Sequence, residues 1–513
     1  MNKLHKIIFI ITLFIFTIGM CCIACMPDND LWARLIVGKH ILENLSILKQ
    51  DFYSYTPTHY WYDHEWGSSF IFYTILKYFG VKGLIFLKGI LCGLILFIAY
   101  KTIELRKPES TTPFNILYFV IMFLAFKDNL GLIIRCLMFT CLFFALFVYI
   151  LEKARNGKYK SLIWLPIITI FWANLHGGCL SGIGLIALYA IGEFLNKKPF
   201  LPFLYSFFGS LFTTFINPYG WEYVKFLFAA GLMDRKEIAE WNSSFDSVYI
   251  KSFIAYKLYL AAAFITAISS TFLKKLKLKD LDKTKIIITV FLAYLSITHV
   301  RHQFFFVYYA GVLWYDEFYS LFNSLINIIC EKFNIGKETR DNTVIIKEMA
   351  VYFLLFLAVF TPLTNKKEIR ITETEYPRFA VEFIDINKIK GNLLVNFNHA
   401  SYCAYKLFPQ NRIFMDGRYE EVYNPKLLTE LIDFYDLKIN ADEFLDKYKT
   451  DIIILEQKFP VYDKMLENNN WRFVFGNNLS GVFVRANKAQ NNYQYPIPYD
   501  EYYNDNLFQN HMK

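Results

Sequence analysis

The chain has 513 residues, of which 55% are hydrophobic and 19% aromatic, and its mean hydropathy is +0.28. A soluble protein of this size would expose too much apolar surface, so the composition excludes an ordinary soluble enzyme and indicates a membrane protein. The net charge of +9 does not indicate nucleic-acid binding, because the basic residues form short clusters between apolar runs, as membrane topology requires.

Eleven apolar runs predict a polytopic α-helical membrane protein with about eleven transmembrane helices. The first run, residues 7–23, follows Lys3 and Lys6. It is longer than the core of a signal peptide and lacks a small-residue cleavage site, so we expect it to be retained as a span. The other runs are residues 84–100, 114–126, 130–151, 162–175, 179–194, 200–216, 253–273, 286–298, 304–325 and 349–363.

The distribution of Lys and Arg predicts the topology. With the N-terminus in the cytoplasm, every strongly basic loop lies on the cytoplasmic side, as membrane proteins prefer. These loops are residues 101–107, 153–160, 197–198, 274–285 and 332–347. The scheme requires the aromatic segment 65–80 to lie along the outer interface without crossing it. The C-terminal region is then extracytoplasmic.

The first outer loop, residues 27–80, carries acidic residues and a histidine. Asp28 and Asp30 follow the first span, and the cluster Asp63, His64 and Glu65 lies further along. Simpler interpretations stay open for both groups. Asp28 or Asp30 could cap the helix whose apolar face begins at residue 31. His64 and Glu65 could form an interfacial pair beside a tryptophan.

Further polar residues occur at the predicted outer ends of later spans. They are Lys127, Arg135, Asn174, His176, Glu240, Arg301 and His302. Ionisable groups are costly at a bilayer, so their gathering on one face predicts a shared polar cavity. Alternatively, Asn174 and His176 satisfy backbone groups where a helix breaks, and Arg135 and Arg301 extend toward lipid headgroups.

Beyond residue 364 the hydropathy falls and short strand and helix patterns alternate. This predicts a small, mainly parallel α/β domain over residues 365–486, followed by a flexible polar tail over residues 487–513, after a transmembrane domain of residues 1–364. Asp416, Gly417 and Arg418 follow a predicted strand, where such sheets usually bind ligands, although a salt-bridged turn is the alternative. The chain lacks both GxGxxG and GxxxxGK[ST] phosphate loops, which disfavours a nucleotide site.

The order of these motifs resembles a known group. Residues 28–32 (DNDLW), 51–56 (DFYSYT) and 61–66 (WYDHEW) look like the first outer loop of the GT-C class of bacterial integral-membrane glycosyltransferases. They are closest to a branch with a DHEW-like signature and a soluble C-terminal domain. The similarity continues through residues 172–178 (WANLHGG), 217–220 (NPYG), 240–241 (EW), 301–302 (RH) and 416–418 (DGR).

The resemblance implies a glycosyltransferase of the bacterial inner (cytoplasmic) membrane. Such an enzyme moves a sugar from a polyprenyl-phosphate donor in the lipid to a glycan, lipid or protein acceptor outside the cytoplasm. The acidic residue that the class uses maps onto Asp28 or Asp30, which implies a carboxylate general base. The departing phosphate then needs cations, for which Lys127, Arg135, Arg301 and protonated His302 or His176 are the candidates.

Two further points stay open. A divalent cation, Mg or Mn, held by Asp28, Asp30, Asp63 or Glu65 is used by some members of the class and not by others. Two other functions are also compatible with the chain. A transporter or flippase would favour internal repeats, and we find none that is convincing. A non-catalytic scaffold for cell-surface assembly would tolerate loss of the outer-loop carboxylates.

Overall fold

The computed structural model describes residues 3–23, 26–108, 112–130, 133–233, 238–273, 281–332 and 371–496. The chain divides into two compact units. One, the helical unit, comprises Met1–Cys25 and Ile85–Lys367, and the other, the α/β unit, comprises Met26–Leu84 and Glu368–Lys513. The first outer loop thus packs with the C-terminal region, whereas the domain boundaries predicted from sequence grouped it with the spans.

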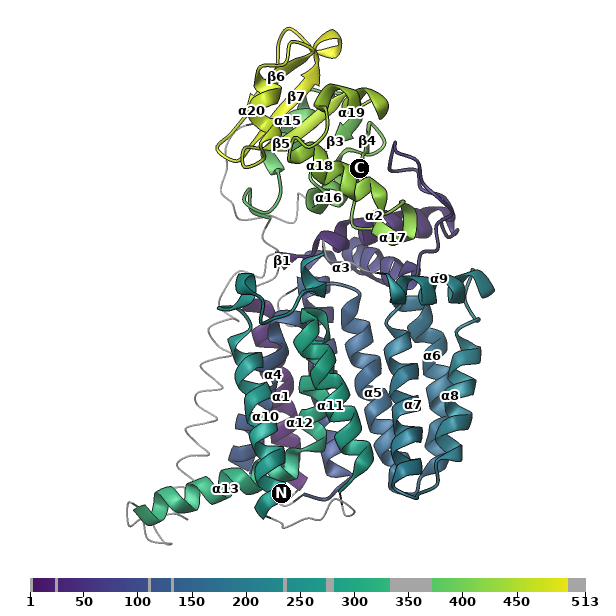
Figure 1. Cartoon of the computed structure of the whole chain (residues 1–513), viewed down its shortest axis with the longest axis vertical. Helices are drawn as coiled ribbons and strands as arrows, with labels where there is room; N and C mark the ends of the chain where they lie inside the picture. The colour runs from purple at the N-terminus through teal and green to yellow at the C-terminus, as the bar shows by residue number, and fades with distance from the viewer. Residues whose placement is uncertain are drawn as a thin grey trace. The chain divides into compact units, whose positions relative to one another are not determined.

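The helical unit is a bundle in which α7 packs against α8 and α11, and α12 packs against α4 and α11 (Figure 1). Its helices are α1 (Lys3–Ile23), the second half of α3 (Trp66–Glu104), α4 (Thr112–Leu130), α5 (Leu137–Arg155), α6 (Trp164–Leu175), α7 (Cys179–Leu195), α8 (Leu201–Thr213), α9 (Trp221–Leu232), α10 (Ile254–Leu273), α11 (Lys283–Thr298), α12 (Gln303–Leu313) and α13 (Tyr315–Lys332). Shorter elements are β2 (Ile133–Ile134), η1 (Tyr159–Ile163), η2 (Ala239–Trp241), η3 (Ser247–Tyr249) and η5 (Val300–His302).

Two of the described helices, Trp66–Glu104 and Leu137–Arg155, are long and apolar enough to cross a membrane. Other apolar helices, such as Cys179–Leu195, are shorter. The predicted total of eleven spans therefore stays a prediction, and the run at residues 349–363 lies outside the described residues. Gly80 has a φ of 64° and breaks α3 into two helices, so the aromatic segment before it is distinct from the apolar helix after it.

The predicted run at residues 304–325 is not one helix. The structure has α12 and α13, separated at Trp314, whose φ of −103° and ψ of 12° lie outside the helical region. Asp316 and Glu317 open α13, where acidic side chains favour a helix N-terminus, and α13 runs across the direction of the other helices (Figure 1). Hydropathy alone missed this break, because aromatic residues continue on both sides of it.

Buried ion pairs hold one end of the bundle together. Arg155 on α5 binds Glu193 on α7 at 2.8 Å and Asp282, the N-cap of α11, at 2.8 Å. Tyr189 donates a hydrogen bond to Glu152 at 2.9 Å. The sequence analysis counted Arg155 among the basic loop residues, but its guanidinium ties three helices together. Leaving Arg155 or Glu193 unpaired would be expensive, because both side chains are buried.

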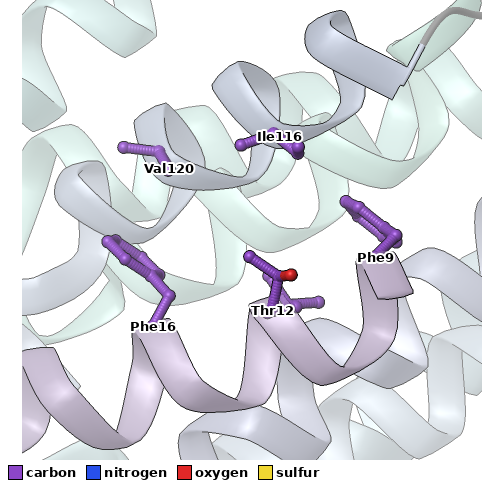
Figure 2. A pocket seen from close by; sticks show the side chains of 6 residues that line it. Phe9, Thr12, Phe16, Ile116 and Val120 are labelled. Carbon is purple, nitrogen blue, oxygen red and sulfur yellow. The ribbon is translucent and has the colours of Figure 1, made fainter. Parts of the chain in front are cut away.

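An apolar groove lies between α1 and α4. Figure 2 shows its walls, which are Phe9, Thr12, Leu13, Phe16, Ile116 and Val120. These side chains offer no ionisable group and a single hydroxyl, so the groove has no acid, base or metal ligand. We interpret it as a packing gap between two apolar helices.

The α/β unit is built on a five-stranded sheet with the order β4-β3-β5-β7-β6. Strands β3, β4 and β5 are parallel, whereas β7 pairs antiparallel with both β5 and β6. The predicted small α/β sheet is confirmed, but it is not mainly parallel, because its last two strands form an antiparallel hairpin. The strands of this sheet are β3 (Gly391–Leu394), β4 (Asn411–Ile413), β5 (Ile452–Glu456), β6 (Trp471–Gly476) and β7 (Ser480–Arg485).

Helices from both parts of the sequence cover this sheet. The outer loop contributes β1 (Met26–Pro27), α2 (Asn29–Asn44) and the first half of α3, and the C-terminal region contributes α15 (Arg378–Ile386), α16 (Phe397–Leu407), α17 (Tyr419–Val422), α18 (Lys426–Tyr435), α19 (Ala441–Lys447), α20 (Val461–Leu466) and η6 (Ala486–Lys488). α2 packs against α16. Trp32 is fully buried there, with its ring 5.0 Å from that of Tyr402 and 5.8 Å from that of Tyr376.

The outer loop also extends the edge of the sheet. Ser54 forms a parallel bridge with Ile413 of β4, and Tyr55 donates a backbone hydrogen bond to Ile413 at 3.0 Å. Arg418, which is 1% exposed, binds Asp51 of the loop at 2.5 Å and Asp416 at 2.8 Å. Residues 416–418 therefore form the salt-bridged turn given above as the alternative, and the turn also binds the loop.

The ionisation of Asp51 follows from this arrangement. Burial by itself would raise the pKa of Asp51, but the charge of Arg418 and several hydrogen bonds outweigh burial and lower it. Asp51 is therefore ionised at neutral pH, and the pair consists of full charges in a site closed to water.

We predict that Arg418→Gln destabilises the chain strongly. The substitution leaves Asp51 and Asp416 as buried charges without their guanidinium, and loss of one partner of a buried ion pair costs ~3–5 kcal/mol. Thermal unfolding of the purified chain in detergent, followed by tryptophan fluorescence, would measure the change. Arg472→Gln, at an exposed position, is the matched control. Equal midpoints for the two variants would contradict the prediction.

Candidate functional site

Helix α2 positions the two acidic residues of the first motif. Asp28 is the N-cap, and its Oδ1 accepts a hydrogen bond from the Asp30 backbone N–H at 2.9 Å. Asp30 lies in the first turn, four residues before Arg34, so their side chains share one helix face. A Cβ at position 417 would lie 2.6 Å from Asp30 Oδ1. A side chain at position 417 would therefore displace the Asp30 carboxylate from its present position.

Arg34 is the centre of a buried carboxylate cluster. Its guanidinium lies 2.7 Å from Asp63, 3.2 Å from Glu65 and 3.4 Å from Glu421. We define the carboxylate cluster as these four residues with Asp30 and His64. His64 Nδ1 lies 3.3 Å from Glu421 Oε1, and its Nε2 lies 3.8 Å from Glu65 Oε1.

Acidic groups outnumber cations in this cluster, and Glu421 shows the consequence. Burial raises the pKa of Glu421 to about 7, with a further rise from the charges of Asp63 and Glu65, against the opposing effect of Arg34 and His64. Trp61 Nε1 donates a hydrogen bond to Glu421 Oε2 at 2.8 Å. Glu421 is thus half-protonated near neutral pH, and the cluster can hold a proton.

The cluster also contains potential metal ligands. His64, Glu65 and Glu421 each offer one ligand atom, and these atoms lie within 4.8 Å of one another. This donor set fits a divalent cation, although an imidazole ligand favours Mn or Zn over Mg. Arg34 competes for the same carboxylates. Of the ligands expected from sequence, Asp28 is used as a helix cap and Asp63 binds Arg34.

A second cluster lies in the helical unit. Arg135 forms an ion pair with Glu240 of η2, and the Arg301 guanidinium lies 4.7 Å above the Trp241 ring. The Trp241 ring is 5.8 Å from that of His302. We define Arg135, Glu240, Trp241, Arg301 and His302 as the arginine cluster. Burial would raise the pKa of Glu240, but Arg135 and Arg301 lower it to about 2.

The imidazole of His302 is neutral in this arrangement. Burial lowers the pKa of His302 to about 3, assisted by the charges of Arg301 and His299. The expectation of a protonated His302 facing phosphate therefore needs correction, because desolvation and the neighbouring Arg301 guanidinium disfavour its charge. His302 can still donate a hydrogen bond.

His176 is held in one tautomer. Its Nδ1 accepts a hydrogen bond from the Gly178 backbone N–H at 2.8 Å and lies 2.9 Å from Thr140 Oγ1. Nδ1 is therefore the acceptor, and Nε2 carries the proton. A Cβ at Gly178 would lie 2.4 Å from Thr140 Oγ1, so the glycine allows this contact.

The remaining predicted residues have local partners. Asn174 donates hydrogen bonds to the carbonyls of Ile170 and Ile216, each at 2.8 Å, which agrees with the simpler interpretation of a helix break. Lys127 pairs with its neighbour Asp128. Both side chains of this pair are about 30% exposed, so Lys127 can still exchange its partner for another anion.

The predicted site residues thus fall into two groups. Asp28, Asp30, Asp63, His64 and Glu65 belong to the α/β unit, and Lys127, Arg135, Asn174, His176, Glu240, Arg301 and His302 belong to the helical unit. The single shared cavity stays a prediction. Sequence reasoning missed Arg34 and Glu421. The spacing of Arg34 from Asp30 was an available signal, whereas Glu421 meets partners more than 350 residues away and had none.

The sequence resemblance predicts a GT-C-like fold, and the chain combines a helix bundle with an α/β unit that includes the acidic first loop. Comparison with solved structures agrees. The chain superposes on the oligosaccharyltransferase of Archaeoglobus fulgidus, tethered with an acceptor peptide containing the NVT sequon, with a TM-score of 0.58 and 11% identity, covering 89% of this chain and 69% of that chain.

A second structure, AglB from the same organism in complex with an inhibitory peptide and a dolichol-phosphate, gives a TM-score of 0.57 and 11% identity over 88% of this chain and 69% of that chain. AglB is a GT-C family member, so the chain has a GT-C-like fold. No family model matches the sequence, and no curated protein matches it. The particular branch suggested by the motifs therefore stays a prediction.

We predict that Glu421 makes stability depend on pH. Its folded-state pKa of about 7 exceeds the ordinary 4.5, so the folded chain binds more protons between these values. The contribution of Glu421 to stability is then fully present below pH 4.5 and is lost as the pH rises through 7, by at most about 3 kcal/mol.

Thermal unfolding midpoints measured from pH 4.5 to 8 would test this dependence. Glu421→Gln mimics the protonated side chain, so the unfolding midpoint of this variant is expected not to show the fall with rising pH that Glu421 causes. Glu467→Gln, at an exposed position, is expected to show the same fall as the wild-type chain. Parallel pH profiles for the wild-type chain and Glu421→Gln would refute the assignment.

Proposed function

We propose that this chain is a membrane glycosyltransferase that moves a sugar from a polyprenyl-phosphate donor to an acceptor outside the cytoplasm. The observation that carries the proposal is the GT-C-like fold, shared over 89% of the chain with an oligosaccharyltransferase. The structures of that protein contain an acceptor peptide in one case and an inhibitory peptide with dolichol-phosphate in the other. The carboxylate cluster and the arginine cluster supply the two kinds of group that such a transfer needs.

The carboxylate cluster supplies the base. An acceptor hydroxyl has a high pKa, so its attack on the anomeric carbon is assisted by a carboxylate that takes the proton. Asp28 is committed to capping α2. Asp30 is half-buried beside Gly417, and it lies one turn before Arg34 on α2. We therefore assign Asp30 as the base and Asp28 as its support.

The bond changes are those of a direct displacement. The acceptor oxygen forms a bond to the anomeric carbon and loses its proton to Asp30. The bond between that carbon and the phosphate oxygen breaks, and its electron pair stays on the phosphate. The configuration at the anomeric carbon is thereby inverted.

The arginine cluster supplies the stabilisation of the leaving phosphate. Arg135 and Arg301 are permanently charged, and a guanidinium fork binds two phosphate oxygens. His302, being neutral, would contribute a hydrogen bond. We place this cluster at the extracytoplasmic face of the membrane, with the N-terminus in the cytoplasm and the α/β unit outside, as the distribution of basic loops indicates. The resemblance to bacterial glycosyltransferases implies that this membrane is the inner membrane of a bacterium.

We predict that Asp30→Asn lowers sugar transfer by roughly 10²–10⁴-fold, the usual contribution of a general base. Asp28→Asn should lower it far less, because asparagine is as good an N-cap as aspartate. Transfer of labelled sugar from the isoprenoid lipid fraction would be followed in membrane vesicles from the source cell. Asp463→Asn, at an exposed position, controls for the substitution itself.

Immunoblotting would show that each variant inserts at the level of the wild-type chain. Loss of transfer in Asp28→Asn alone would move the base to Asp28. Normal transfer in both variants would reject Asp28 and Asp30 as the base.

We also predict that Arg135→Gln and Arg301→Gln each weaken binding of a polyprenyl phosphate by at least about tenfold, because a charge-assisted hydrogen bond contributes ~1.5–3 kcal/mol. Native mass spectrometry of the chain in lipid nanodiscs would give the dissociation constants. Arg412→Gln, on the exposed side of β4, is the control. Unchanged affinity in both arginine variants would exclude this cluster as the phosphate site.

A further inference from the structure

The arginine cluster contains an anion of its own. Glu240 Oε1 is the partner of Arg135, and the charges of Arg135 and Arg301 both act to keep the Glu240 carboxyl ionised. The Glu240 side chain is 34% exposed, whereas that of Arg135 is 12% exposed. Arg135 is thus the more buried member of the pair, and Glu240 is the more exposed one.

The short segment that carries Glu240 is anchored just after it. The Val300 backbone N–H donates to the Asn242 carbonyl at 3.0 Å, and His299 Nδ1 donates to the Trp241 carbonyl at 2.6 Å. The Trp241 ring in turn lies under Arg301. Rotation of the Glu240 side chain alone can therefore release Arg135 while Trp241 and Arg301 stay in place.

We propose that the Glu240 carboxylate is an internal stand-in for the phosphate group of a lipid-linked donor, which displaces it from Arg135. This inference rests on the proposed function and concerns the same site. A partly buried guanidinium needs a counter-anion, because an unpaired charge in such a position is costly. Carboxylate and phosphate both present two oxygens to the guanidinium fork, so one can replace the other without a change in Arg135.

Charge balance supports the exchange. A sugar–phosphate–lipid diester carries one negative charge, and the phosphate gains a second when the glycosidic bond breaks and its electron pair stays on oxygen. With Glu240 in place, the net charge of Arg135, Arg301 and Glu240 together is +1. When Glu240 is displaced, the positive charges of Arg135 and Arg301 both act on the phosphate. These two charges balance the two negative charges of the departing phosphate better than the single negative charge of the donor. Stabilisation that increases along the reaction is the kind that accelerates it.

The test is the dissociation constant of polyprenyl phosphate for the full chain in nanodiscs of a neutral phospholipid. Glu240→Gln removes the competing charge and is expected to bind roughly fivefold to tenfold more tightly, the effect of losing one charge-assisted contact to a competitor. Glu222→Gln is the matched control, because Glu222 is exposed on α9 and pairs with Lys225. It is expected to bind like the wild-type chain. Should Glu240→Gln fail to accumulate, Glu240→Ala serves the same purpose.

A double-mutant comparison makes the result specific. If Glu240 competes for Arg135, the gain from Glu240→Gln must disappear in the presence of Arg135→Gln. A gain that persists without Arg135 would overturn the inference. Equal or weaker binding by Glu240→Gln, with Arg135→Gln still impaired, would overturn it while leaving the proposed phosphate site intact. Unchanged binding by Arg135→Gln would instead reject the phosphate site itself.

Binding measurements with other ligands distinguish between the possible sources of the phosphate group. Sodium phosphate, phosphatidylglycerol and polyprenol without phosphate are tested with the same variants. The gain in Glu240→Gln is expected only with polyprenyl phosphate. An equal gain with sodium phosphate or phosphatidylglycerol would overturn the assignment to a lipid-linked donor, and a gain with polyprenol would overturn the charge mechanism.

Discussion

Arg418 forms the interaction on which the α/β unit depends. Its guanidinium is buried between Asp416, two residues before it, and Asp51, more than 360 residues away. A buried arginine with two carboxylates is stable only while all three groups stay together. The first outer loop is therefore held against the edge strand of the sheet, where its backbone also pairs with β4. The loop between the first two predicted spans is therefore part of the folded α/β unit.

This attachment brings the acidic motif of the loop onto the carboxyl end of a parallel strand. Asp30 lies against Gly417, and Arg34 gathers Asp63, Glu65 and Glu421 around it. Carboxyl ends of parallel strands are the usual ligand-binding edge of α/β sheets. The C-terminal region thus contributes a charged side chain, Glu421, to the same cluster as the proposed base.

The two clusters have opposite electrostatic character. In the carboxylate cluster acidic groups outnumber cations, so a proton is retained near neutral pH and the site suits proton transfer. In the arginine cluster, positive groups exceed the one carboxylate, so the site suits an anion. Glycosyl transfer from a lipid phosphate requires both, a proton acceptor for the attacking oxygen and a cationic site for the departing phosphate. The variants of Asp30 and Arg135 test the two proposed roles separately.

Local patterns in the sequence predicted many of the apolar helices and the small sheet, and they limited the helix cap to Asp28 or Asp30, because each of these features depends on neighbouring residues or on a short period. They also identified most polar residues of both clusters by type. Only the tertiary structure decided which of these residues meet. Glu421, Arg34 and Asp51 acquire their roles from partners distant in the chain, and the neutral state of His302 comes from burial beside Arg301. Burial and long-range pairing are properties of the packed chain, so no local pattern in the sequence carries them.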